Sequence, residues 1–190
     1  MPKILFGTCA LIFAATTGLA LGQDIPQQAG GYETSLGSTK FRAPNGEVRQ
    51  DLVAAISTWL SAQFSLPAIE QQPIIKLVPP EEITALRYHL STGGSAEDNN
   101  NTVAIYQDRT QTIYLADDWN GSTPAEQSIL VHEMVHHFQN ILGLKYECRQ
   151  AREEFAYRAQ DRWLIQLGHD LATDFELDAF SLLVKTKCFY

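Results

Sequence analysis

Apolar residues near the start of the predicted domain recur every three or four positions, the spacing that places them on one face of an α-helix. The members of this stripe are Leu52, Val53, Ile56, Trp59, Leu60 and Phe64. Because Pro67 follows the stripe, we predict an amphipathic helix that begins near Val48 and ends before this proline. Residues 23–47 are rich in Gln, Gly, Ser, Thr and Pro, which predicts a flexible N-terminal segment ahead of a folded domain at 48–190.

The next patterns predict a short strand, a helix and a hairpin. The apolar run 73–78 is typical of a strand, and Pro79-Pro80-Glu81-Glu82 is typical of the start of a helix, which then continues to Leu90. A polar loop at 93–101 is followed by two stretches rich in β-forming residues, 103–106 and 112–115. These two stretches predict a β-hairpin.

Three more helices are predicted in the C-terminal part of the chain. Thr123, Pro124 and Glu126 supply an N-cap, a proline at the first helical position and a capping-box acid. The helix that they begin should run to about Leu142, where Gly143 ends it. A second helix is predicted at about 149–167, and a last one at about 173–186. The apolar face of the last helix consists of Phe175, Leu177, Phe180, Leu183 and Val184.

Together these elements predict an α+β fold, a mainly helical domain with a small sheet or hairpin packed against the helix that starts at Pro124. The chain has 190 residues, of which 45% are hydrophobic and 19% charged, values that suit one globular domain. The formal net charge of -8 argues against a nucleic-acid or anionic-membrane surface, because either would need clustered Lys and Arg.

Residues 1–22 have the pattern of a secretory signal peptide. Lys3 supplies the positive start, an apolar run follows, and Ala20-Leu21-Gly22 is a small-x-small cleavage site. The alternative is a transmembrane anchor, but Gly and Thr residues interrupt the run. We therefore expect a secreted or periplasmic protein that keeps no membrane anchor after cleavage.

The cysteines agree with export. Cys9 lies inside the predicted signal, which leaves Cys148 and Cys188 in the mature chain. Two cysteines in an exported chain most simply form one disulfide, which would pin the C-terminal tail to the segment after the predicted 124–142 helix. The alternative is a pair of buried thiols.

The chemistry of the chain centres on His132-Glu133-Met134-Val135-His136. Residues four apart lie on one face of a helix, so His132 and His136 present both imidazoles to one cation. Glu133 would sit beside the metal, where it can take a proton from the attacking water. The alternative is a chance match on an amphipathic helix.

A catalytic zinc ion commonly has three protein ligands, so a third donor is required. The candidates after the motif are His137, Glu147, Glu153, Glu154 and His169. His137 points about 100° away from His136, which is typical of a surface residue or of one that supports a ligand from outside. Glu153 and Glu154 lie on the next predicted helix, and an antiparallel helix pair could bring either carboxylate to the histidines.

Here the chain resembles the gluzincin metallopeptidases, most closely their compact members. These proteins pair H-E-x-x-H on one helix with a glutamate on a following helix, often with a small residue three positions later. Glu153-Glu154-Phe155-Ala156 matches this second element, and the resemblance covers residues 122–166. It implies a zincin-like fold and one zinc ion held by His132, His136 and Glu153, with Glu154 in reserve. It also implies a peptide or protein substrate extended along the edge of the small sheet.

Several further residues are candidates for supporting roles. Tyr157 lies one turn beyond Glu153, so its hydroxyl could donate to an oxyanion, although a structural tyrosine is the alternative. An acid could orient a ligand histidine through a hydrogen bond. The candidate acids are Asp117, Asp118, Asp161, Asp174 and Asp178. Aromatic residues that could line a cleft, or equally belong to the core, are Tyr106, Tyr114 and Trp119. His89 and His169 are predicted to be structural.

We therefore predict an exported zinc peptidase in which Glu133 is the general base. One alternative is a binding module that keeps the zincin scaffold without turnover. Another is a zinc hydrolase that acts on a non-peptide amide.

Overall fold

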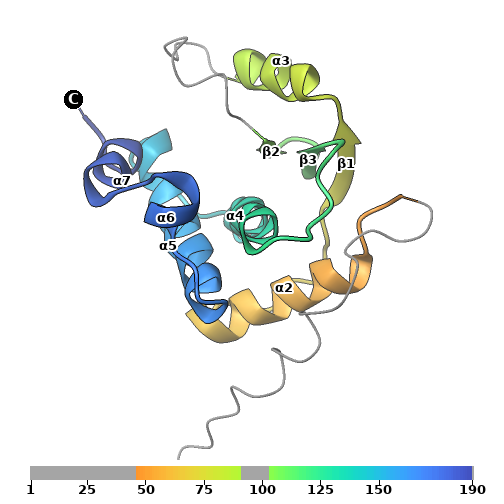
Figure 1. Ribbon diagram of the computed structural model, residues 1–190, viewed down its shortest axis with the longest axis horizontal. Coiled ribbons are helices and arrows are strands. Elements are labelled where there is room, and N and C mark those ends of the chain that lie inside the picture. The colour runs from red at the N-terminus through yellow and green to blue at the C-terminus, as the bar shows by residue number, and fades with distance from the viewer. Residues whose placement is uncertain (1–45, 91–102, 190) are drawn as a thin grey trace, which may run out of the picture. The chain divides into compact units, whose positions relative to one another are not determined.

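The computed structural model describes residues 46–90 and 103–189, all of them in a compact unit that spans 39–190. The predicted signal peptide, residues 23–45 of the predicted flexible segment and the predicted loop at 93–101 lie outside the described residues. So does the side chain of His89. The fold is α+β, as predicted, with six helices and one small sheet in the described ranges (Figure 1).

The predicted elements are confirmed up to residue 167, with shifts of a few residues at their ends. They are α2 (Gln50–Phe64), β1 (Ile74–Val78), α3 (Pro80–Leu90), β2 (Ala104–Gln107), β3 (Thr112–Ala116), α4 (Pro124–Ile141) and α5 (Arg149–Gln166). Within the described ranges, no helix is both long and apolar enough to span a bilayer.

The sheet has the strand order β1-β3-β2, with β1 parallel to β3 and β2 antiparallel to it. All five residues of β3 are buried, which fits its central position. Ile105 of β2 packs toward α3 in a cluster around Ile83, whereas its neighbour Tyr106 reaches His137 of α4. Successive residues of a strand face opposite sides, so α3 and α4 cover opposite faces of the sheet. Strand β2 is an edge strand beside α4.

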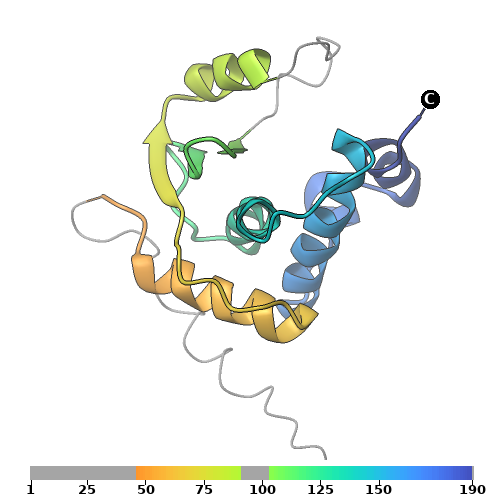
Figure 2. The ribbon, with the colours of Figure 1, turned by 180° about the vertical axis from the view of Figure 1, so that it is seen from behind.

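Helix α4 runs through the middle of the described fold, with α2, α5 and the sheet around it (Figure 2). Its start is fixed by a complete capping box, because the Thr123 side chain accepts from the Glu126 N–H and the Glu126 carboxylate accepts from the Thr123 N–H. Leu130, Met134 and Phe138 are almost fully buried. Such a helix offers a rigid support for the side chains that it carries.

The predicted last helix at 173–186 is wrong, because the chain forms two short helices instead. Helix α6 (Leu171–Phe175) ends at Glu176, whose φ of 54° is left-handed, and α7 (Ala179–Thr186) begins after Asp178. Asp178 caps α7 by accepting from the Ser181 N–H at 2.8 Å. The apolar face predicted to be core is also largely exposed, with Phe180 at 72%.

The predicted disulfide between Cys148 and Cys188 is confirmed. Cys148 is the N-cap residue of α5, and its sulfur accepts from the Ala151 N–H at 3.4 Å. Cys188 follows α7. The bond therefore fastens the C-terminal end of the described chain to the first turn of α5.

Candidate metal centre

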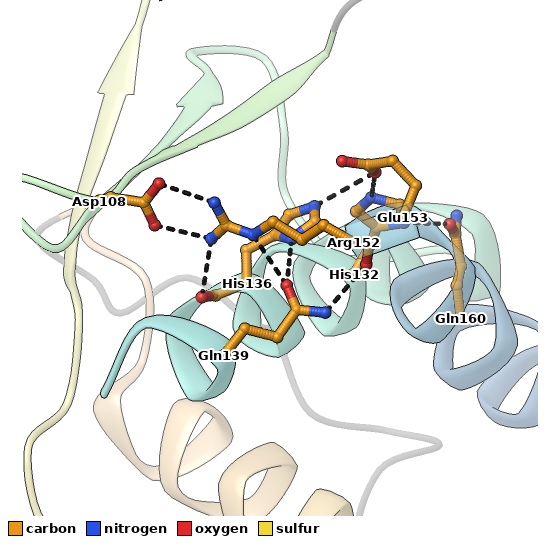
Figure 3. Close-up of polar contacts among 7 residues, drawn as sticks. All are labelled: Asp108, His132, His136, Gln139, Arg152, Glu153 and Gln160. Atoms are coloured by element: carbon orange, nitrogen blue, oxygen red, sulfur yellow. Dashed lines mark hydrogen bonds and ion pairs between the residues drawn. The ribbon is translucent and has the colours of Figure 1, made fainter. Parts of the chain in front are cut away.

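Two histidines of α4 and one glutamate of α5 converge on one point (Figure 3). The Nε2 atoms of His132 and His136 lie 3.1 Å and 3.3 Å from Oε2 of Glu153. One ligand atom from each of these three residues lies within 4.8 Å of the other two. No other group of three or more His, Cys, Asp or Glu residues in 46–90 and 103–189 is arranged to hold a metal ion.

The geometry follows from two packed helices. His132 and His136 are one turn apart on α4, and their ring centroids lie 5.0 Å apart. Helix α5 packs across α4 and places Glu153, in the second turn of α5, against the two histidines (Figure 1). The adjacent Glu154 points elsewhere, because it is exposed and its Oε2 pairs with Nζ of Lys187 at 2.8 Å. The cluster thus contains Glu153, which the resemblance favours, and does not contain Glu154.

The three groups stabilise one another electrostatically. Burial by itself raises the pKa of Glu153, but the charge of His136 and hydrogen bonds from both histidines hold that pKa well below its ordinary value. Burial lowers the pKa of His136, yet the nearby Glu153 carboxylate outweighs burial and leaves the pKa raised. The cluster therefore favours positive charge at the point where the three groups meet.

Each histidine is held from behind by a glutamine amide. Nδ1 of His132 lies 3.0 Å from Oε1 of Gln160, and Nδ1 of His136 lies 2.9 Å from Oε1 of Gln139. An amide oxygen only accepts, so each Nδ1 carries a proton and each Nε2 is turned toward Glu153.

Aspartates are the predicted candidates for this supporting role, and the prediction is wrong for Asp161, Asp174 and Asp178, because each of them binds another group. Asp161 accepts from the Leu171 N–H, Asp174 pairs with His169, and Asp178 caps α7. Asp117 and Asp118 lie in the exposed turn after β3. Spacing could have identified the glutamines, because Gln139 follows His136 by three residues and Gln160 follows Glu153 by seven, which places each pair on one helix face.

Arg152 joins the centre to the sheet. Its Nη1 and Nη2 donate to the two carboxylate oxygens of Asp108 at 2.7 Å each, in the turn between β2 and β3. Its Nε donates to Oε1 of Gln139 at 2.9 Å, and its Nη2 also donates to the carbonyl of His136 at 3.1 Å. The guanidinium thus connects the hairpin, the amide behind His136 and the backbone of α4 (Figure 3).

Glu133 is 8% exposed and lies between the cluster and the edge strand. Burial raises the pKa of its carboxyl group, and the charges of His132 and His136 together with the backbone N–H of Tyr106 only partly offset that effect. A carboxylate with a raised pKa is suited to accept a proton and release it again near neutral pH.

Tyr157 packs edge-on against His132, with ring centroids 4.8 Å apart. Its other surroundings include a cavity of about 510 Å³ between α5, α6 and α7, whose lining includes Asp161, Leu171 and Leu182. Tyr157 therefore lies between His132 and this cavity.

The prediction that His137 lies on the surface or supports a ligand is wrong. It is completely buried, its Nε2–H donates to the Gln71 carbonyl at 2.7 Å, and its Nδ1 accepts from the Tyr106 hydroxyl at 3.0 Å. Burial lowers its pKa. His137 therefore joins α4 to the sheet and to the segment before β1.

The remaining candidates are structural. His169 pairs with Asp174 at 3.0 Å, away from the cluster. Tyr114 belongs to the core under α3, and Trp119 is buried with its Nε1–H donating to the Glu126 carbonyl at 2.9 Å. The aromatic residues near the strands thus belong to the core, which is the second of the two roles predicted for them.

Comparison with known proteins gives a family but no described activity. No curated protein and no solved structure matches the chain. A family described as a domain of unknown function, DUF6647, matches residues 45–189, which include every element from α2 to α7 and all residues of the cluster. The chain therefore belongs to the DUF6647 family.

Proposed function

We propose that the chain is a zinc-dependent hydrolase and that its substrates are peptides or proteins. The observation that carries the proposal is the convergence of two imidazole nitrogens and one carboxylate oxygen beside a buried glutamate. Two histidines and one glutamate are a recurrent ligand set of catalytic zinc sites, which keep a fourth position for water or substrate.

The donor atoms fit zinc in kind, and the two separations that involve Glu153 fit it in spacing. A tetrahedral ion bonded at about 2.1 Å holds its ligand atoms about 3.4 Å apart. The Nε2 to Oε2 distances of 3.1 Å and 3.3 Å are close to that separation. The raised pKa of His136 adds support, because surroundings that stabilise a proton also stabilise a metal cation.

The number of donors supports turnover over a purely structural ion. A structural zinc is normally enclosed by four protein ligands. In the part of the chain that the structure describes, the group contains three, and Glu133 is not one of them. This observation favours an enzyme over a binding module that lacks turnover.

Within this proposal each residue of the site has a separate role. Bound zinc would polarise the scissile carbonyl and lower the pKa of water. The Glu133 carboxylate would accept the proton of the attacking water and pass it to the leaving nitrogen. Tyr157, whose ring contacts His132, would donate its hydroxyl proton in a hydrogen bond to the developing oxyanion. The outer edge of β2 would hold an extended substrate by backbone hydrogen bonds.

The compartment is part of the same proposal. The disulfide between Cys148 and Cys188 supports export, because such bonds persist in oxidising compartments. We therefore propose that the mature protein is secreted or periplasmic.

The test is the variant Glu133→Gln, which keeps the shape of the side chain and removes its basicity. We expect one zinc ion per chain in the variant as in the unaltered protein. Turnover of a peptide identified in a library screen should fall by about 10² to 10⁴, the usual contribution of a general base. Metal content is measured by atomic emission and cleavage by mass spectrometry.

Glu154→Gln is the matched control, because Glu154 is an exposed carboxylate outside the cluster. It should retain both zinc and activity. Equal cleavage by the Glu133→Gln variant would contradict the general-base role, and absence of zinc from the unaltered protein would contradict the proposal as a whole.

A further inference from the structure

The orientation of two amides decides whether the histidines can bind a metal. A histidine binds through Nε2 only when Nε2 has a free lone pair, which in the neutral ring requires the proton to be on Nδ1. An amide that presents its oxygen to Nδ1 favours this tautomer, and an amide that presents its NH₂ group favours the other. Gln139 and Gln160 both present oxygen.

Arg152 forces the orientation of Gln139. Its Nε–H can only donate, so the Gln139 atom 2.9 Å away must be oxygen. Its backbone carbonyl can only accept, so the Gln139 atom 2.9 Å from that carbonyl must be nitrogen. Gln139 is 2% exposed, which leaves little access for water to replace either partner.

Arg152 is itself held in place by the turn between β2 and β3. The two Asp108 oxygens bind its guanidinium at 2.7 Å each, a fork geometry that sets the plane of the group. The same plane directs Nε toward Gln139 and Nη2 toward the His136 carbonyl. The orientation of the amide thus depends on an ion pair with the hairpin.

Ser128 performs the same task for Gln160. The Ser128 hydroxyl donates its proton to the Ala125 carbonyl at 2.8 Å. It can then only accept from Gln160, whose Nε2 lies 3.2 Å away. Ser128 is completely buried and Gln160 is 4% exposed, so the amide oxygen is left for Nδ1 of His132.

We propose that Arg152 and Ser128 are positioning residues that set the tautomers of the two zinc-ligand histidines through Gln139 and Gln160. This inference rests on the proposed zinc site. It states that the zinc affinity of that site depends on residues that do not contact the metal. Such supporting contacts are typically worth 10-fold to 100-fold in metal affinity.

The experiment measures zinc dissociation constants by chelator competition in the full folded chain. Arg152→Met removes every N–H of the side chain, and Ser128→Ala removes only the hydroxyl. Each variant should bind zinc about 10-fold more weakly, and the double variant more weakly still. Thermal unfolding of the metal-free proteins is measured in parallel, since a loss of stability alone would leave the affinity of the folded protein unchanged.

Two variants serve as matched controls. Lys187→Met breaks a different ion pair of α5, between Lys187 and Glu154, which does not involve Gln139 or Gln160. Thr186→Val removes a buried hydroxyl that donates to the Leu182 carbonyl. Both should keep the zinc affinity of the unaltered protein.

A charge control separates positioning from electrostatics. Arg152→Lys keeps the positive charge but replaces the guanidinium fork by a single nitrogen, which cannot bind Asp108 and orient Gln139 in the same geometry. It should therefore weaken zinc binding as Arg152→Met does. Unchanged affinity in Arg152→Met and Ser128→Ala, or full affinity in Arg152→Lys, would overturn the inference and leave the proposed zinc site intact. An unaltered protein without zinc would overturn both.

Discussion

Glu153 and Glu154 are neighbours in sequence with opposite surroundings. Glu153 meets two histidines, whereas Glu154 is exposed and pairs with Lys187. We predict that Glu153→Gln abolishes stoichiometric zinc binding, because the amide removes the negative charge that the cluster requires. Glu154→Gln should bind zinc normally and lose at most about 1 kcal/mol of stability, the usual limit for an exposed ion pair. Isothermal titration with zinc checks the pair, and equal binding by both would contradict the ligand assignment.

At the residue scale, the sequence could predict that His132 and His136 lie on one face of a helix, because one helical turn separates them. It could also favour Glu153, since the resemblance indicates a glutamate at this place on the following helix. The glutamines behind the histidines were missed because carboxylates were expected there, although an amide oxygen accepts equally well. The role of Arg152 depends on Asp108, which lies in a turn far away in sequence, so periodicity could not predict it.

At the element scale, the start of α4 is the best-defined boundary in the described fold. Thr123 accepts from the Glu126 N–H at 3.2 Å, and Glu126 returns a bond to the Thr123 N–H at 3.1 Å. We predict that Thr123→Ala destabilises the protein by about 1 kcal/mol in urea unfolding, the typical effect of a lost N-cap. Thr58→Ala is the control, because the Thr58 hydroxyl only adds a bond to the Ala54 carbonyl inside α2. A loss as large in the control as in Thr123→Ala would contradict the capping role.

Signals at helix ends also explain why one helix is predicted at 173–186, where the chain forms α6 and α7. The capping box before α4 stands next to a proline, so both signals agree. Between α6 and α7 the helical spacing of apolar residues continues across the break, and this spacing predicts a single helix. Asp178 is one of the predicted candidates for support of a ligand histidine, whereas its side chain caps a new helix by accepting from the Ser181 N–H.

At the scale of the whole molecule, the disulfide connects the end of α7 to the start of the helix that carries Glu153. Its cysteines are 40 residues apart, for which the chain-entropy model gives about 4 kcal/mol. We predict that the double variant Cys148→Ser and Cys188→Ser loses about 2 to 5 kcal/mol of unfolding free energy. Zinc affinity should also fall, because the bond fastens the start of α5, about one and a half turns before Glu153, to the C-terminal end of the described chain.

Reduction provides the control for this prediction. A reducing agent should lower the stability of the unaltered protein to that of the double variant and leave the variant unchanged. Denaturant unfolding with and without the reducing agent makes the comparison. Equal stability of the oxidised protein and the variant would show that the bond contributes nothing to folding.

The strand order β1-β3-β2 constrains how this molecule can fold. Strands β2 and β3 are joined by a short turn and can pair locally, whereas the parallel pairing of β1 with β3 must first close a long loop that contains α3. Loop closure costs entropy before the contacts repay it, so the hairpin can form early and β1 joins later. Asp108, which holds Arg152, lies in the turn of that early hairpin. The residue that holds Arg152 beside the His132, His136 and Glu153 cluster can therefore be in place before β1 completes the sheet.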